Sequence, residues 1–293
     1  MKLHARSISP LKKRMGAAAL ALGLAPLLLA GCSQQDLATW SRLGMPEPAT
    51  EEAQLILQLW QGSWIVAGFV TLVVYGLIAL AIILYRRRRG DEIPPQTRYN
   101  IPIEVLYTVV QLIIVFGLFY FTARDQTAII KLTDDFDHSV NVVAYRWSWG
   151  FNYMEEDTYD VGTPAVAPVL YLPVNGKVRF ELTSPDVIHS FWVPDFLFKM
   201  DVVPGRINKF ELTPNKLGEF PGRCAELCGV DHSRMLFSVK VVSRPEFDQH
   251  MQNLRDRGYS GLLETGRVLA DLAGTPNCEG PEASLLACRE RDA

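Results

Sequence analysis

The chain has 293 residues, of which 48% are hydrophobic, and a formal net charge of −3 at pH 7. This length leaves room for one ordinary domain beside membrane segments, and the nearly balanced charge gives no indication of nucleic-acid binding. The hydrophobic residues are unevenly distributed, so they define distinct regions along the chain.

The N-terminus has the composition of a targeting segment. A basic run at 12–14 precedes an apolar stretch, 15–30, and Leu-Ala-Gly stands directly before Cys32. This pattern predicts a lipoprotein signal peptide over 1–31, with cleavage before Cys32 and diacylglycerol on its sulfur. An ordinary signal peptide or an uncleaved first helix is the alternative.

Two stretches without charged residues follow, at 64–85 and 105–123. Each approaches the ~20 residues that a helix needs to cross the hydrocarbon core of a bilayer. Four consecutive arginines place the connecting loop, 86–101, in the cytoplasm. We therefore expect a transmembrane hairpin of two helices over 55–124. The segment 32–54 and everything after the hairpin then lie on the outer side of a bacterial plasma membrane. A lipid on Cys32 requires the same orientation.

From about His138 the pattern changes to short β-like runs separated by proline and glycine. Short strands at regular spacing with such turn signals predict a sandwich or a Greek-key barrel, here over 134–243. The extension 244–293 is weakly helical to about residue 272 and receives no chemical role. The runs expected as strands are 140–147, 169–172, 178–183, 207–213 and 235–242.

A dense group of metal-binding residue types lies near the end of the predicted β-domain. Two thiols, two imidazoles and a thioether suit copper and exclude magnesium or calcium as the main occupant. Two thiols separated by three residues can face one space and bridge two metal ions, whereas a mononuclear electron-transfer copper uses one cysteine. A disulfide or a structural zinc site is the alternative for the cysteine pair. The group consists of His189, Cys224, Glu226 (through its carbonyl), Cys228, His232 and Met235.

Two segments carry a resemblance to a known family. His189 lies in Asp-Val-Ile-His-Ser-Phe-Trp-Val-Pro, and the loop from Cys224 reads Cys-Ala-Glu-Leu-Cys-Gly-Val-Asp-His-Ser-Arg-Met. Both resemble subunit II of haem-copper cytochrome c oxidases, and the resemblance extends from about residue 54 to 243. It implies a membrane-anchored all-β fold, in which a two-helix transmembrane hairpin precedes a cupredoxin-like Greek-key β-barrel. It also implies a dinuclear copper centre, CuA, at the six residues above.

The resemblance further implies an activity and partners. A subunit II of an aa3-type oxidase takes electrons from a cytochrome c, or from a quinol-oxidising complex that bears one. It passes them to subunit I, which holds haem a, haem a3 and copper, and which reduces oxygen to water coupled to proton pumping. The other expected partners are subunit III and membrane lipid. The chain would be part of an enzyme and inactive alone.

Three further residues receive roles from the resemblance, each beside a simpler interpretation. Trp147 is the expected point at which electrons enter, while the other aromatic residues of 145–153 form one face of a strand. Glu104 is expected to open a proton pathway into subunit I, although it could also be a membrane-boundary anchor. The carboxylate of Glu226 is expected to reach a magnesium or manganese ion shared with subunit I, or else to be solvated.

Acidic residues gather on both sides of the aromatic run, where they would steer a basic electron donor. A solvated loop is equally consistent with any one of them. They are Asp134, Asp135, Asp137, Glu155, Glu156 and Asp157.

Two cysteines remain in the tail, Cys278 and Cys288, and their location outside the cell suggests a disulfide. Two free cysteines in a mobile tail are the alternative. No Cys-x-x-Cys-His motif occurs, so the electron donor is expected to be a separate protein.

Three other functions are alternatives to the oxidase. A quinol oxidase subunit II lacks the copper ligands, and nitrous oxide reductase usually adds a large propeller. A copper-binding or assembly lipoprotein has no need of the hairpin.

Overall fold

The computed structural model describes residues 38–86 and 96–263. The predicted signal peptide, Cys32, most of the arginine-rich loop and the tail cysteines lie outside the described residues. Up to Met45 the chain forms a unit of its own with the short 3-10 helix η1 (Trp40–Arg42), and a second unit begins at Pro46. The helices of the second unit are α3 (Glu51–Leu84), α4 (Ile101–Ile129) and α5 (Arg244–Asp256), with 3-10 helices η2 (Pro194–Phe196) and η3 (His232–Arg234).

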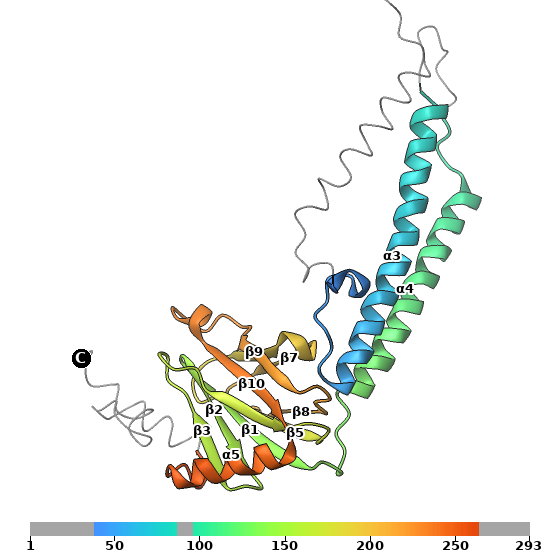
Figure 1. Ribbon diagram of the computed structural model, residues 1–293. Coiled ribbons are helices and arrows are strands. Elements are labelled where there is room, and N and C mark those ends of the chain that lie inside the picture. The colour runs from blue at the N-terminus through green and yellow to red at the C-terminus, as the bar shows by residue number, and fades with distance from the viewer. Residues whose placement is uncertain (1–37, 87–95, 264–293) are drawn as a thin grey trace, which may run out of the picture. The chain divides into compact units, whose positions relative to one another are not determined.

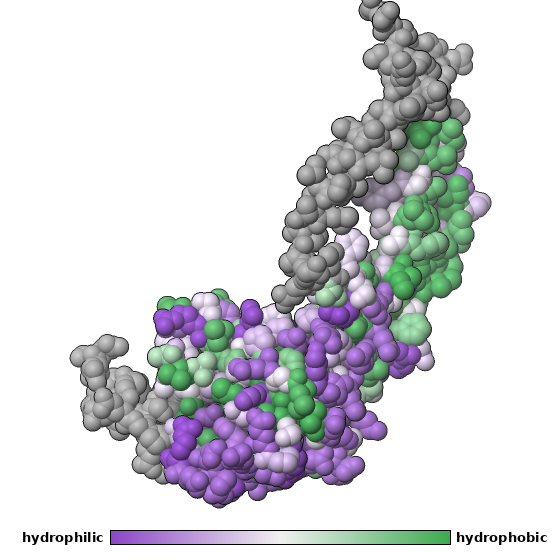
Figure 2. All heavy atoms as spheres, in the orientation of Figure 1, coloured by the Kyte–Doolittle hydropathy of each residue, from purple (hydrophilic) through white to green (hydrophobic). Residues whose placement is uncertain are grey.

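Helices α3 and α4 contact each other along the hairpin (Figure 1), and their surface is largely hydrophobic (Figure 2). Each has an 18-residue apolar window and the length needed to cross a membrane. With 34 and 29 residues, both helices are longer than the uncharged stretches that predict them. Helix α3 begins well before residue 64, and α4 extends beyond its uncharged stretch at both ends. The side chains of Thr50 and Asn100 accept backbone N–H groups and cap the two helices.

Within residues 96–263 ten strands follow, and they form two five-stranded sheets with the orders β3-β2-β1-β5-β8 and β4-β10-β9-β6-β7 (Figure 1). Their bounds are β1 His138–Tyr145, β2 Ser148–Tyr153, β3 Thr158–Val161, β4 Val169–Pro173, β5 Val178–Thr183, β6 His189–Val193, β7 Phe198–Val202, β8 Asn208–Leu212, β9 Gly218–Cys224 and β10 Leu236–Val242. Most pairs are antiparallel, but β1 pairs with β5 and β4 with β10 in parallel. The predicted class, a helical hairpin followed by a cupredoxin-like β-domain, is confirmed, and the β-domain is a two-sheet sandwich.

The core between the two sheets is aromatic. Trp149, Phe180, Phe191, Phe210 and Phe237 are all nearly inaccessible to solvent and belong to one hydrophobic cluster. Their rings meet in stacked and edge-to-face pairs, for example Phe180 on Phe210 with centroids 4.7 Å apart. This packed core gives the residues at the strand ends a fixed position.

The expectation of one strand with an aromatic face over 145–153 holds for Trp149, Phe151 and Tyr153, which are buried on β2, but Tyr145 lies on β1 and the strand expected over 140–147 ends two residues early. Strand β1 ends at Tyr145, the chain turns at Arg146 and Trp147, and β2 begins at Ser148, which pairs with Tyr145. The turn was not predicted because neither of its two residues is a glycine, proline or asparagine, the residues that usually mark a hairpin turn. Trp147 is therefore a turn residue. The tail helix is also shorter than expected: α5 ends at Asp256, just before Gly258 at a φ of +88°.

A buried ion pair ties the segment after α4 to the sandwich. Glu211, on β8, is 5% exposed and accepts hydrogen bonds from the Arg179 side chain on β5 at 2.8 Å and from the Thr133 amide at 3.1 Å. The Arg179 guanidinium also donates to the Thr133 carbonyl and lies over the Phe136 ring. Burial raises the pKa of Glu211, but the hydrogen bonds from Arg179 and Thr133 outweigh it and hold the pKa below 4.5.

The substitution Glu211→Gln should destabilise the β-domain by about 2 kcal/mol, because it leaves a mostly buried guanidinium without its carboxylate. Since folding lowers the pKa of Glu211, its contribution is present above pH 4.5 and lost as the pH falls through the lower folded value. Thermal unfolding of the purified protein, followed by near-ultraviolet circular dichroism, should therefore show a difference that shrinks below pH 4.5. The matched control is Glu181→Gln, which breaks the more exposed pair with Lys209 and should cost less than about 1 kcal/mol.

Candidate metal centre

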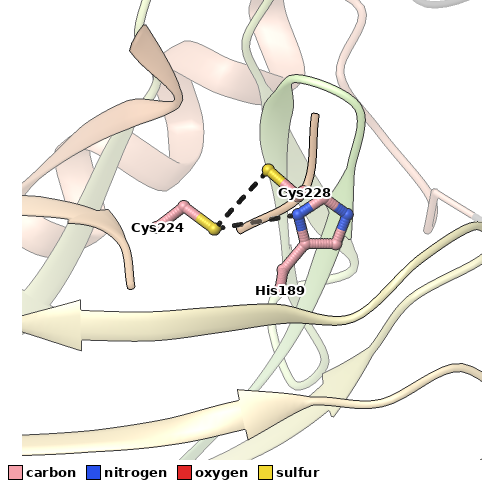
Figure 3. Close-up of side chains that lie close together, drawn as sticks. All are labelled: His189, Cys224 and Cys228. Atoms are coloured by element: carbon pink, nitrogen blue, oxygen red, sulfur yellow. Dashed lines mark hydrogen bonds between the residues drawn. The ribbon is translucent and has the colours of Figure 1, made fainter. Parts of the chain in front are cut away.

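The six predicted ligands meet at one end of the sandwich. His189 begins β6 and Cys224 ends β9, and these strands pair through Phe191 and Cys224, so two segments 35 residues apart become neighbours. The Sγ atoms of Cys224 and Cys228 are 3.8 Å apart, and the Nδ1 atom of His189 is 3.8 Å from Cys224 Sγ (Figure 3). On the other side, Cys228 Sγ lies 3.6 Å from His232 Nδ1 and 3.7 Å from Met235 Sδ.

The backbone carbonyl of Glu226 completes the group at 3.2 Å from Cys224 Sγ. The two sulfurs thus occupy the middle, and each has one imidazole and one weaker donor beside it. Sulfur ligands about 2.3 Å from a metal ion in tetrahedral geometry are about 3.8 Å apart, which is the separation found here. This donor set of thiols, imidazole nitrogens and a thioether fits copper.

The two thiols are free and buried, and their 3.8 Å separation is far from the ~2.05 Å of a disulfide. Burial raises the pKa of Cys224, but hydrogen bonds from His189 and from the Glu226 and Ser190 backbone outweigh it and lower the pKa. Burial and the neighbouring Cys224 charge raise the pKa of Cys228. One thiol of the pair therefore loses its proton readily. Ionisation of the second thiol requires a positive partner such as a metal ion.

Asp186 fixes the orientation of His189. Its Oδ1 atom is 2.9 Å from His189 Nε2, which leaves Nδ1 facing the cysteines. Burial raises the pKa of Asp186, but hydrogen bonds from His189 and from the Val187 and Arg146 amides hold it at about 2. The carboxylate is therefore ionised, as expected of an outer partner that orients a metal-binding histidine.

Asp186→Asn should lower the affinity for copper about 10- to 100-fold, the usual effect of losing an outer partner of a metal-binding histidine. Competition for copper with a chelator of known affinity measures this change. The control Asp201→Asn removes a carboxylate from an exposed position on β7 and should leave the affinity unchanged. Equal affinities of the two variants would show that Asp186 does not position His189.

Trp147 lies directly against the ligand loop. Its Nε1 donates to the carbonyl of Cys228 at 3.2 Å. Gly229 has a φ of +125°, and a Cβ atom there would stand 3.0 Å from the indole. The turn between β1 and β2 and the loop after β9 thus form one surface, and glycine at this position allows the close approach.

Two residues that the sequence did not single out support the centre. The Arg146 amide and side chain both donate to Asp186 Oδ2, so the turn that carries Trp147 is tied to the carboxylate that holds His189. Trp149 Nε1 lies 3.4 Å from the carbonyl of Met235. These partners are 40 and 86 residues apart, and no local pattern in the sequence indicates such pairs.

His232 is half-buried and lines a cleft of about 550 Å³ beside the centre. Trp192, Lys199 and Arg223 line the same cleft, and the Arg223 guanidinium lies over the Trp192 ring. The side chain of Glu226 is exposed, so its carboxylate is free to meet a further group while its carbonyl faces the cysteines.

Glu104 stands apart from this centre, in the first turn of α4. Its carboxylate accepts the Asn100 amide at 2.9 Å while the Asn100 side chain accepts the Ile103 amide. This reciprocal capping gives Glu104 a local structural role beside any role in proton transfer.

The acidic residues expected beside Trp147 lie at the opposite end of the β1–β2 hairpin. Asp134, Asp135 and Asp137 precede β1, and the other three acidic residues follow β2, whereas Trp147 is in the turn between these strands. The length of β1 separates the two ends by about 23 Å.

Three of these acidic side chains have structural partners, and the Asp137 carboxylate accepts the Lys177 amide at 2.8 Å. Glu155 accepts the Ser139 amide at 2.7 Å, and Glu156 lies 2.9 Å from His138 Nδ1, whose other nitrogen faces Arg244. The structure therefore does not support the expectation that these acidic residues steer a basic electron donor toward Trp147.

Fold and site together define a class: a two-pass membrane protein with a cupredoxin-like domain whose sulfur and imidazole ligands fit copper. Two family profiles match the chain, the transmembrane domain of cytochrome c oxidase subunit II over 38–122 and its periplasmic domain over 160–242. A probable cytochrome c oxidase subunit 2 of Streptomyces avermitilis is 49% identical over 287 residues, covering 85% of this chain and 89% of the relative. The chain belongs to the cytochrome c oxidase subunit II family.

A more distant relative in sequence agrees with this assignment. Cytochrome c oxidase subunit 2 of Mycobacterium tuberculosis is 32% identical over 305 residues, covering 83% of this chain and 82% of that protein. Among solved structures, the periplasmic domain of subunit II of cytochrome oxidase from Bradyrhizobium japonicum is 28% identical with a TM-score of 0.41. It is matched over its whole length and covers 44% of this chain.

Proposed function

We propose that the chain is subunit II of an aa3-type cytochrome c oxidase. It receives electrons one at a time from a cytochrome c at a dinuclear copper centre and passes them to haem in subunit I. There, oxygen is reduced to water, coupled to proton pumping. The observation that carries the proposal is the convergence of His189, Cys224, Cys228, His232 and Met235 with the Glu226 carbonyl at one point.

When bound, copper held by the two cysteines and the two histidines would supply a one-electron carrier. The chain's own residues hold that site in place. Asp186 orients one imidazole, and the aromatic core and the β6–β9 pairing fix the positions of His189 and Cys224. A site positioned by packed strands needs little reorganisation during turnover.

Trp147 is the proposed point at which electrons enter. Its indole is partly exposed and its Nε1 is hydrogen-bonded to the carbonyl of a copper cysteine, Cys228. It therefore offers a direct connection from the surface to the centre.

The exposed carboxylate of Glu226 is proposed to bind a magnesium or manganese ion shared with subunit I, because a hard oxygen ligand suits such ions. Glu104 is proposed to open the proton pathway in subunit I, at the start of α4. The further partners we propose are subunit III and, as donor, a cytochrome c or a quinol-oxidising complex that bears one.

The proposed location is a bacterial plasma membrane, with the copper domain on the outer face and a lipid anchor at Cys32. The cytoplasmic arginine run and the lipoprotein-like N-terminus support this orientation independently. A disulfide between Cys278 and Cys288 agrees with an oxidising compartment.

The test is the near-infrared absorption and electron paramagnetic resonance of the purified full chain after copper loading. A purple mixed-valence species with two copper ions per chain is the expected result. A blue spectrum with one copper ion, or loss of copper during purification, would overturn the proposal of a dinuclear centre.

A further inference from the structure

The segment that leads into α3 is built into the β-domain. Ala49 is completely buried and belongs to the hydrophobic cluster of the sandwich. Its amide donates to the Asp195 carbonyl at 2.9 Å, and its carbonyl accepts the Asn215 amide at 3.0 Å. Thr50 is also completely buried and pairs with Pro214 in an isolated β-bridge. The backbone before α3 is therefore hydrogen-bonded both to η2 and to the segment between β8 and β9.

Glu52 adds side-chain hydrogen bonds at this junction. It lies in the first turn of α3, and its carboxylate accepts the Thr213 amide at 3.0 Å and the Thr213 hydroxyl at 3.3 Å. The carbonyl of Thr213 in turn accepts the Glu51 amide at 3.0 Å. Thr213 is only 8% exposed, so removal of the Glu52 carboxylate would leave its two donors largely without an acceptor.

The other end of the hairpin has an equivalent contact. After α4, the amide and the hydroxyl of Thr133 donate to Glu211 at 3.1 and 2.8 Å, and Glu211 is two residues before Thr213. Each helix of the hairpin is thus connected to β8, or to the residue after it, through a carboxylate that accepts both donors of one threonine. Two structural parts joined only by short chain segments are expected to move relative to each other. The two contacts oppose such movement.

We propose that Glu52 is a positioning residue: through Thr213 it holds the copper domain in one orientation on the membrane hairpin. This inference rests on the proposed function, because the step it serves is electron transfer to subunit I. In that step copper is oxidised by one electron and the haem iron is reduced from ferric to ferrous. A misplacement of about 1 Å by a change far from the reacting groups can cost an enzyme up to about 100-fold in rate.

The first test is amide hydrogen exchange on the purified full chain, a measurement that needs no copper. Glu52→Ala should raise the exchange rates of the Ala49 and Asn215 amides about tenfold or more, because a junction that loses two hydrogen bonds opens more readily. Both amides keep their own acceptors in this variant. Glu52→Gln retains one acceptor oxygen for the Thr213 amide and should change these rates less than about twofold. The matched control is Glu51→Ala, which removes an exposed carboxylate from the same helical turn and should behave as the wild type.

The second test uses the assembled oxidase and follows haem reduction after rapid photochemical reduction of the copper centre. Glu52→Ala should slow this step about threefold or more. The mixed-valence copper spectrum and the reduction of copper by cytochrome c should stay unchanged, since Glu52 supplies none of the six donors. Glu52→Gln and Glu51→Ala should both keep the wild-type rate. A purely structural role for Glu52 would instead lower the copper content or slow both steps together.

Unchanged exchange at Ala49 and Asn215 in Glu52→Ala, or an unchanged rate of haem reduction, would overturn the inference. Loss of the copper signal in Glu52→Ala, or equal effects of Glu52→Ala and Glu51→Ala, would overturn it as well. Failure of the proposed function gives a different result, because the wild-type oxidase would then lack the mixed-valence spectrum. The exchange rates would still report whether Glu52 holds the junction.

Discussion

Cys228→Ser is expected to reduce the copper content from two ions to at most one per chain and to abolish the mixed-valence spectrum. Cys228 Sγ is the atom at which three other donors meet: Cys224 Sγ, His232 Nδ1 and Met235 Sδ, all within 3.8 Å. A hydroxyl is a harder and less readily ionised ligand, so it does not replace a bridging thiolate. Turnover with cytochrome c should fall at least about 100-fold, beyond the 10- to 100-fold effect of losing an outer partner.

Metal analysis and near-infrared absorption of the purified oxidase measure the first effect, and oxygen consumption measures the second. Cys278→Ser is the matched control, since it removes one cysteine from the tail and none of the six donors. It should retain two copper ions and full turnover. A Cys228→Ser protein with both copper ions and the mixed-valence signal would refute a bridging role for Cys228.

Trp147→Phe should lower kcat with cytochrome c about tenfold or more, which corresponds to about 1.4 kcal/mol of activation free energy. Phenylalanine lacks the N–H group that donates to the Cys228 carbonyl at 3.2 Å, and its smaller ring withdraws from the Gly229 backbone. The copper spectrum should be unchanged, because Trp147 supplies none of the six donors.

Stopped-flow reduction of the copper centre by cytochrome c measures this step directly. Trp40→Phe, at an indole that is 65% exposed and outside the β-domain, serves as the control and should react at the wild-type rate. Wild-type reduction in Trp147→Phe would mean that electrons enter elsewhere. A changed copper spectrum would instead indicate a structural role for the indole.

The candidate site was predictable to the extent that its residues are close in the chain. Five of the six donors fall within twelve residues, from Cys224 to Met235, and their chemistry indicates copper without any knowledge of the fold. His189 entered the prediction through the resemblance of its segment. The structure supplies the reason that it meets the loop, namely the pairing of β6 with β9.

Most of the residues that hydrogen-bond around the ligands could not be predicted from the sequence. Asp186 is only three residues from His189 in the sequence. Arg146, by contrast, is 40 residues from Asp186, and Trp149 is 86 residues from the carbonyl that it faces. Such pairs depend on strand register and on the packing of two sheets, and neither leaves a local pattern.

The hairpin, the β-rich class of the following domain and the copper chemistry could be predicted from the sequence, because apolar length, turn residues and ligand softness are local properties. The reversal of the chain at Arg146–Trp147 is visible only in the folded structure. That reversal brings Trp147 onto the ligand loop and sends the acidic residues to the far end of the hairpin. Its physical reason is the pairing of Tyr145 with Ser148, which buries the side chains of β1 and β2 in the aromatic core without any residue that signals a turn.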